Sequence, residues 1–156
     1  MRRKQRLWAI ALGCLLLIAG CADAAPVFEV PAQQEENAHP ILLSINGTPV
    51  PVLWEENQSV KELFSLLENE SITIATERYG GFEQVGRLPQ SIANDDVQMT
   101  AAAGDIVLYN GNSIVLFYGS NAWAYTKLGR IDGMPAKEIQ KLLDAEETSV
   151  TLSLAE

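Results

Sequence analysis

The sequence has few of the side chains on which many enzyme active sites depend. Its two cysteines, Cys14 and Cys21, both lie among the first 21 residues, and its one histidine, His39, follows a stretch of glutamine and glutamate. A disulfide, a cysteine-based metal site, a thiol nucleophile and a Ser-His-Asp triad are therefore excluded within residues 41–156. We interpret His39 as a solvated linker residue. We expect no metal and no cofactor, and we assign no catalytic residue.

Basic residues are scarce as well. The chain of 156 residues holds 11 lysines and arginines against 20 aspartates and glutamates, and its net charge is −9. Four of the basic residues fall within the first 20 positions, so removing these leaves seven basic against 20 acidic side chains, a net charge of −13. Such a surface repels phosphate backbones, and we expect no nucleic-acid partner. The same charge also serves solubility.

A hydrophobic run long enough to span a bilayer is missing too. The apolar stretch Leu7–Ala19 follows a basic start and is too short for an ordinary transmembrane helix. It leads into Ile18–Cys21 (IAGC), which resembles the bacterial lipobox. The resemblance implies a lipoprotein signal peptide over residues 1–20, lipidation of Cys21 and cleavage before it. The alternatives are an uncleaved anchor or an ordinary signal peptide, and each predicts a domain that faces away from the cytoplasm.

The next segment, residues 21–40, is interpreted as the lipidated cysteine and a flexible tether. Pro26, Pro31 and Pro40 interrupt any periodic pattern, and a flexible coil of this length spans roughly 25 Å. We therefore expect a bacterial cell-envelope protein held to a membrane by lipid. Ala22 stands where an aspartate would resemble an inner-membrane retention signal, which favours the outer membrane where two membranes exist.

Residues 41–156 predict one mainly β domain with two helices. Short runs rich in valine, isoleucine and aromatic residues, bounded by glycine, asparagine or proline, are typical of strands. Eight strands are expected, at 41–46, 49–54, 71–76, 97–102, 106–109, 114–118, 123–131 and 148–154. Helices are expected from Ser59, where Ser59–Glu62 fits a capping box, and with Pro135 at the first helical position. Many short strands with hairpin turns favour a closed or nearly closed antiparallel barrel.

Turn residues add detail to this arrangement. Asn46-Gly47 and Asn110–Asn112 are typical of tight hairpins, and Pro49 and Pro51 suit only an edge strand. The stretch 104–131 predicts a three-stranded antiparallel meander. Residues 77–96, with three glycines and a proline, predict an irregular loop that is functional or pinned by buried side chains.

Two stretches resemble a known family. YGGFEQVGRLP (79–89) and GDIVLYNGNSIVLFYGSNAWAYTKLGRI (104–131), with the strand–strand–helix opening, resemble the small bacterial cyclophilin-like domain family over residues 41–155. The resemblance implies a cyclophilin-like antiparallel β-barrel of about eight strands closed by two α-helices, and no settled activity. Cyclophilins themselves are peptidyl-prolyl isomerases that pair an arginine with an aromatic-lined pocket. Their Phe-His-Arg and Gln-Gly-Gly segments are missing here, and neither Arg78 nor Arg87 occupies a matching motif.

Rings and amides dominate the candidate site, which combines the loop after Glu77 with the strand 123–131. Tyrosine and tryptophan have an apolar body and a hydrogen-bonding tip, which suits a shallow groove for a peptide or small ligand. The candidate groove residues are Tyr79, Phe82, Glu83, Arg87, Trp123 and Tyr125. The alternative is that these rings fill the barrel, because Trp123 and Tyr125 share strand parity and could both face the interior. A calcium site at Asn94–Asp96 is a weaker possibility.

Three functions remain open. The first is an anchored, non-catalytic domain that binds an unknown peptide or small ligand. The second is a peptidyl-prolyl isomerase at the membrane, which would stabilise the amide as it loses planarity. The third is a structural or self-association module that uses apolar strands such as Ile114–Tyr118, where both faces are apolar.

Overall fold

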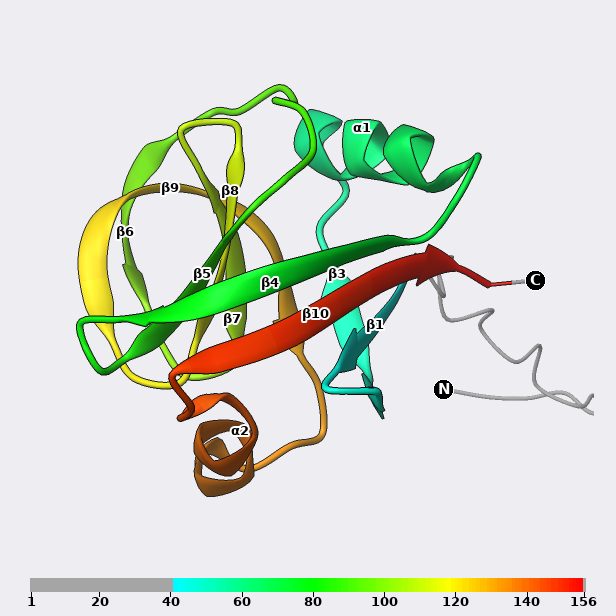
Figure 1. Ribbon diagram of the computed structural model, residues 1–156. Helices are drawn as coiled ribbons and strands as arrows, with labels where there is room; N and C mark the ends of the chain where they lie inside the picture. The colour runs from blue at the N-terminus through cyan, green and yellow to red at the C-terminus, as the bar shows by residue number, and fades with distance from the viewer. Residues whose placement is uncertain (1–40, 156) are drawn as a thin grey trace, which may run out of the picture. The chain divides into compact units, whose positions relative to one another are not determined.

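The computed structural model describes residues 41–155, so the predicted signal peptide, Cys21 and the tether lie outside the described residues. Within that range the chain forms one sheet of ten strands and two helices (Figure 1). The strands are β1 (Ile41–Ile45), β2 (Thr48–Val50), β3 (Val52–Trp54), β4 (Ile72–Tyr79), β5 (Glu83–Arg87), β6 (Val97–Ala101), β7 (Asp105–Tyr109), β8 (Ser113–Phe117), β9 (Asn121–Ile131) and β10 (Glu147–Leu154). The helices are α1 (Gln58–Leu67) and α2 (Ala136–Leu143). The mainly β prediction is confirmed.

The sheet is antiparallel and nearly closed. Its strand order is β2-β1-β10-β4-β5-β8-β7-β9-β3, and β6 pairs with β9 beside this path. The two ends of the path, β2 and β3, are consecutive in the chain and are separated by Pro51 alone. Pro51 has no N–H to donate to a ladder, whereas its carbonyl accepts a hydrogen bond from the Asp132 amide at 2.9 Å. The proline therefore marks the seam at which the barrel closes, as its predicted edge position requires.

The predicted count of eight strands was too low by two. The segment 49–54 forms two strands because Pro51 interrupts it, and the predicted irregular loop contains β5. Gly86 sits inside β5 because Ile74 and Thr76 of the neighbouring strand approach it so closely that no side chain fits. The glycine therefore marks a close approach between strands and not an irregular loop.

The predicted meander was also wrong. β8 pairs with β7 as expected, but β9 pairs with the other edge of β7 and with β6. The free edge of β8 is occupied by β5, where Glu83 lies opposite Phe117. The tight turns themselves are confirmed, since Asn46 and Asn110 adopt φ angles of 50° and 48°.

Both helices exist where they were expected, but their first residues differ from the prediction. The N-cap of α1 is Asn57, whose side chain accepts a hydrogen bond from the Val60 amide at 3.0 Å. The predicted capping box does not form, because the Ser59 hydroxyl donates to the Ala93 carbonyl and Glu62 accepts from the Ala93 amide, each at 2.6 Å. Pro135 is the N-cap of α2 and precedes its first turn.

The helices lie at opposite ends of the barrel, α1 at the top and α2 at the bottom of Figure 1. Each buries an apolar stripe: Val60, Leu63 and Leu67 in α1, and Ile139 and Leu143 in α2. In the part of the chain from 41 to 155, neither helix has the length and apolar character needed to cross a membrane.

Alternate residues of the central strands belong to two separate clusters. Ile114 and Leu116 of β8 pack into the main cluster with both helices, while Val115 and Phe117 face the other way. This second group, named the pocket cluster, consists of Ala101, Val107, Val115, Phe117 and Tyr125, with Phe82, Val85, Met99 and Tyr109 packed against it. The apolar strand Ile114–Tyr118 is thus covered on both faces by its own chain, with no residue more than 6% exposed. It offers no free surface for self-association.

Candidate functional site

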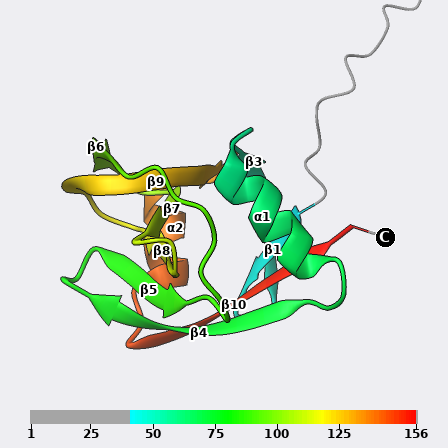
Figure 2. The ribbon, with the colours of Figure 1, turned by 90° about the horizontal axis from the view of Figure 1, so that it is seen from above.

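A pocket of about 490 Å³ opens beside the pocket cluster. Figure 2 shows β6 and β9 along one side of the sheet, β4 and β5 along the other, and β7 and β8 between them. The lining residues come from five strands of this curved surface: Tyr79 of β4, Glu83 and Val85 of β5, Tyr109 of β7, Val115 of β8, and Asn121, Trp123 and Tyr125 of β9. Strands distant in sequence therefore place four aromatic rings and one carboxyl around a single cavity.

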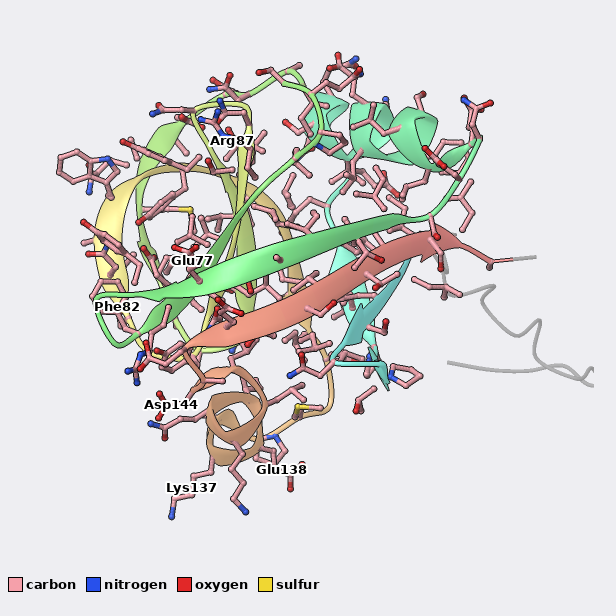
Figure 3. All side chains as sticks on the ribbon, in the orientation of Figure 1. Glu77, Phe82, Arg87, Lys137, Glu138 and Asp144 are labelled. Atoms are coloured by element: carbon pink, nitrogen blue, oxygen red, sulfur yellow. The ribbon has the colours of Figure 1, made fainter. Side chains whose placement is uncertain are left out.

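Four of the six predicted groove residues meet in this pocket: Tyr79, Glu83, Trp123 and Tyr125. The other two do not line it. Phe82 lies in the turn between β4 and β5 and stacks on Phe117, with ring centroids 6.4 Å apart. Arg87 lies at the far end of β5, away from Phe82 (Figure 3), and it lines a separate hollow. The alternative that these rings fill space describes Tyr125, which is a buried member of the pocket cluster, and Phe82, which packs against that cluster. It does not describe Trp123, which is exposed.

Four lining residues were missed by the sequence analysis: Val85, Tyr109, Val115 and Asn121. Val85 was missed because β5 was expected to be irregular. In a strand it shares a face with Glu83, two positions away. Tyr109 and Val115 were assigned to strands, but their lining role depends on which strand pairs with which, and the sequence predicted a different order.

Glu83 is the unusual group in this pocket. Only 5% of its surface is exposed, and its Oε2 has no hydrogen-bond partner within residues 41–155. Strand pairing places it between Tyr79 and Phe117. Because burial disfavours the charged form, the pKa of the Glu83 carboxyl is raised to about 7. Near neutral pH this group therefore exists both as a hydrogen-bond donor and as a carboxylate.

The wall opposite Glu83 is held in place by ring contacts. Tyr125 is 5% exposed and meets Tyr109 and Phe117 edge to face, with centroids 6.0 and 5.6 Å apart. The Asn121 amide donates a hydrogen bond to the Tyr125 hydroxyl at 2.9 Å. Burial raises the pKa of this phenol above its ordinary value, so it stays neutral. Tyr125 is a fixed wall, whereas Tyr79 and Trp123, which are 66% and 57% exposed, form the rim.

Neither arginine considered for isomerase chemistry reaches the pocket. The Arg78 guanidinium binds the carboxylates of Asp144, at 3.3 Å, and Glu146. Arg87 lines the hollow beside Glu77 instead. The described pocket therefore pairs its rings with a carboxyl and not with an arginine.

The possible calcium site at Asn94–Asp96 is not supported by the structure. Asp96 accepts hydrogen bonds from the Thr126 hydroxyl at 2.6 Å and from the Asn110 amide at 3.2 Å. Asn94 and Asp95 line a hollow of about 510 Å³ near the start of α1. Among residues 41–155, no three histidine, cysteine, aspartate or glutamate side chains gather closely enough to hold a metal ion.

Ten antiparallel strands, nearly closed around an apolar interior and with a helix at each end, define a small cyclophilin-like barrel. The chain belongs to the cyclophilin-like family, whose sequence profile matches residues 43–155. The solution structure of the hypothetical protein AF2241 from Archaeoglobus fulgidus has a similar fold, with a TM-score of 0.50 and 20% identity over 78% of this chain and 99% of the archaeal one. Curated proteins gave no match.

Proposed function

We propose that this chain is a lipid-anchored binding protein of the bacterial cell envelope, whose cyclophilin-like domain at residues 41–156 holds a peptide segment or a small ligand without turning it over. The observation that carries the proposal is the pocket of about 490 Å³ walled by four rings. Its volume and its mixture of ring faces with few polar groups are typical of sites for small ligands. The anchor is supported by the lipobox-like Ile18–Cys21 and by the basic start before it.

Substitution of the exposed Trp123 at the pocket rim tests this proposal. Trp123 leaves 57% of its surface in solvent at the pocket rim, although tryptophan is usually well buried. Leu53 on β3 is exposed to a similar degree, 55%, and does not line the pocket. It is therefore a matched control for the loss of an exposed apolar side chain.

The experiment uses the full chain in a non-ionic detergent and libraries of capped hexapeptides and small fragments. Binding is detected by changes in backbone amide chemical shifts. We expect ligands that shift the amides of β5 and β9, with affinity reduced at least tenfold by Trp123→Ala and unchanged by Leu53→Ala. The proposal fails if no library member shifts these amides, or if the two variants bind equally well.

The isomerase remains the alternative activity. The described pocket has aromatic walls, as a proline site requires, but its acidic group is a carboxyl, which does not donate positive charge to a twisting amide, and no arginine or lysine lines it. We therefore expect the full chain to leave the rate of proline isomerisation in a test peptide unchanged. Acceleration that Trp123→Ala abolishes would establish catalysis in place of simple binding.

A further inference from the structure

The buried carboxyl at the base of the pocket lacks a counter-charge. The ion pairs of residues 41–155 join Arg78, Lys127 and Arg130 to other carboxylates, and none of these pairs includes Glu83. Arg87 shares β5 but is four residues away, roughly 13 Å along an extended strand. A buried carboxylate is costly unless it is paired and hydrogen-bonded. The charge that would stabilise it is not supplied by the described part of the chain.

The aromatic rings around Glu83 also favour a positively charged partner. Tyr79, Tyr109, Trp123 and Tyr125 line the cavity with it. The negative faces of such rings attract organic cations, tryptophan most strongly. A carboxylate can accept hydrogen bonds from the N–H groups of such a cation. A guanidinium can make both interactions at once, because it stacks on rings and donates two parallel hydrogen bonds to a carboxylate.

We propose that the pocket binds an organic cation that carries N–H groups, an ammonium or guanidinium, with its charge against the Glu83 carboxylate and its stem between Trp123 and Tyr125. This inference rests on the proposed binding function and names the ligand class. The cation belongs either to a lysine or arginine side chain of a peptide or to a free small amine. Both sources present the same chemistry to the pocket.

The proposal predicts how affinity depends on pH. The titratable groups that face Glu83 are phenols: Tyr79 from β4, Tyr109 from β7, Tyr118 beyond β8 and Tyr125 from β9. Burial raises the pKa of Tyr118 and Tyr125 above the ordinary phenol value. With the pKa of Glu83 raised to about 7, the ionised fraction and hence the affinity for a cation fall about 30-fold between pH 8 and pH 5.5.

The test compares charged probes with neutral probes of the same shape. The full chain is titrated with N-butylguanidinium and with N-butylurea, and in a second arm with acetyl-Gly-Arg-Gly-amide and its citrulline analogue. We expect each guanidinium probe to bind at least tenfold more tightly than its neutral counterpart at pH 8, with the advantage lost in Glu83→Gln. Tighter binding of the peptide identifies a peptide side chain as the source, and tighter binding of the free cation identifies a small amine.

A matched control separates a local ion pair from the general negative charge. Glu77→Gln removes the same charge from an exposed position on β4 that does not line the pocket (Figure 3). We expect this variant to keep the preference for guanidinium. Equal binding of charged and neutral probes, equal effects of the two variants, or affinity that rises as the pH falls would overturn the inference. If the preference for guanidinium is absent while neutral library ligands still lose affinity in Trp123→Ala, the binding function stands and the cation inference fails.

Discussion

Glu83 concentrates the chemistry of the domain in one residue. It is an acid placed among rings, and the stability of the fold depends on whether it is charged. In the unfolded chain its pKa is near the ordinary value, whereas in the folded domain burial raises the pKa to about 7. The unfolded state therefore releases this proton first as the pH rises. Stability from the protonated form is fully present below the unfolded pKa and is lost as the pH rises toward 7.

The first prediction compares the wild type with Glu83→Gln, which keeps the shape and never ionises. Near pH 4.5 the two proteins should have similar free energies of unfolding. At pH 8 the variant should be the more stable by about 3 kcal/mol, because only the wild type buries a charge. Urea unfolding of both proteins across this range measures the difference. A difference that stays constant with pH would show that Glu83 is solvated in the folded state.

Gly86 is the second residue whose role depends on its surroundings. A Cβ at this position would lie 2.5 Å from Ile74 Cγ2 and 2.6 Å from Thr76 Cγ2. Both contacts are with β-branched side chains on the adjacent strand, which have little freedom to move. The absence of a side chain at Gly86 therefore allows β4 and β5 to pair with these two methyl groups packed directly against the glycine.

We predict that Gly86→Ala lowers the free energy of unfolding by about 1–3 kcal/mol through overpacking. Thr76→Ser removes one of the two clashing methyl groups and keeps the hydroxyl that bonds Gln84 and the Thr148 carbonyl. The double variant should recover part of the loss, so that the two substitutions are not additive in a double-mutant cycle. Additive effects would place the cost of alanine elsewhere, in the backbone of β5.

At the scale of elements, α2 is held to the barrel by a buried amide. Gln84 on β5 is fully buried and donates hydrogen bonds to the carbonyls of Leu143 and Ala145, at 2.7 and 2.6 Å. Its own oxygen accepts from the Thr76 hydroxyl at 3.0 Å. Leu143 is the last residue of α2, and its carbonyl also accepts from the Ala145 amide at 2.9 Å, so Gln84 ties the end of the helix and the residues just after it to β5.

The third prediction contrasts this amide with a surface ion pair in the same region. Gln84→Met should cost about 1–3 kcal/mol, because the Ala145 carbonyl loses the amide that bonds it, while the Leu143 carbonyl keeps only its bond from the Ala145 amide. Arg78→Met removes the ion pairs to Asp144 and Glu146, which lie at the surface, and should cost less than about 1 kcal/mol. Chemical denaturation of both variants measures the contrast. Equal losses would mean that the exposed charges, and not the amide, hold α2.

The elements also show what sequence patterns determine. Hairpin turns such as Asn46-Gly47 and the presence of both helices depend on neighbours in the chain, and both were predicted correctly. The order of β7, β8 and β9 was not, because it depends on which distant strand takes the free edge of β8. The capping of α1 failed for the same reason, since Ser59 and Glu62 bind Ala93, some 30 residues away in sequence.

The pocket likewise combines features that the sequence predicted with features that depend on strand pairing. The sequence indicated that Tyr79, Glu83, Trp123 and Tyr125 belong near one another, and they share a cavity. It did not reveal that Glu83 is buried and has an unpartnered oxygen, because burial arises from β5, β8 and β9 together. The sequence therefore predicted Glu83 as a groove residue, but not that it would be the buried carboxyl of the pocket.

For the whole molecule, the distribution of charge supports a proposal in which the lipid anchor binds the membrane and the acidic domain does not. Without its first 20 residues the chain carries a net charge of −13, which anionic headgroups repel. The proposed lipid at Cys21 would then supply all of the membrane affinity. Two or more acyl chains hold a protein stably, whereas one holds it only marginally.

The fourth prediction follows from this proposal. In a bacterial expression host, Cys21→Ala should remove the chain completely from the membrane fraction, or leave it as a precursor whose mass still includes residues 1–20. Wild-type chain should stay with the membranes in 1 M salt, because acyl chains do not depend on charge, and should be released by detergent. Fractionation and intact mass measure both outcomes. If Cys21→Ala stays on membranes after loss of residues 1–20, the domain itself must bind there against its own charge; if wild type keeps those residues, the apolar run Leu7–Ala19 is the anchor.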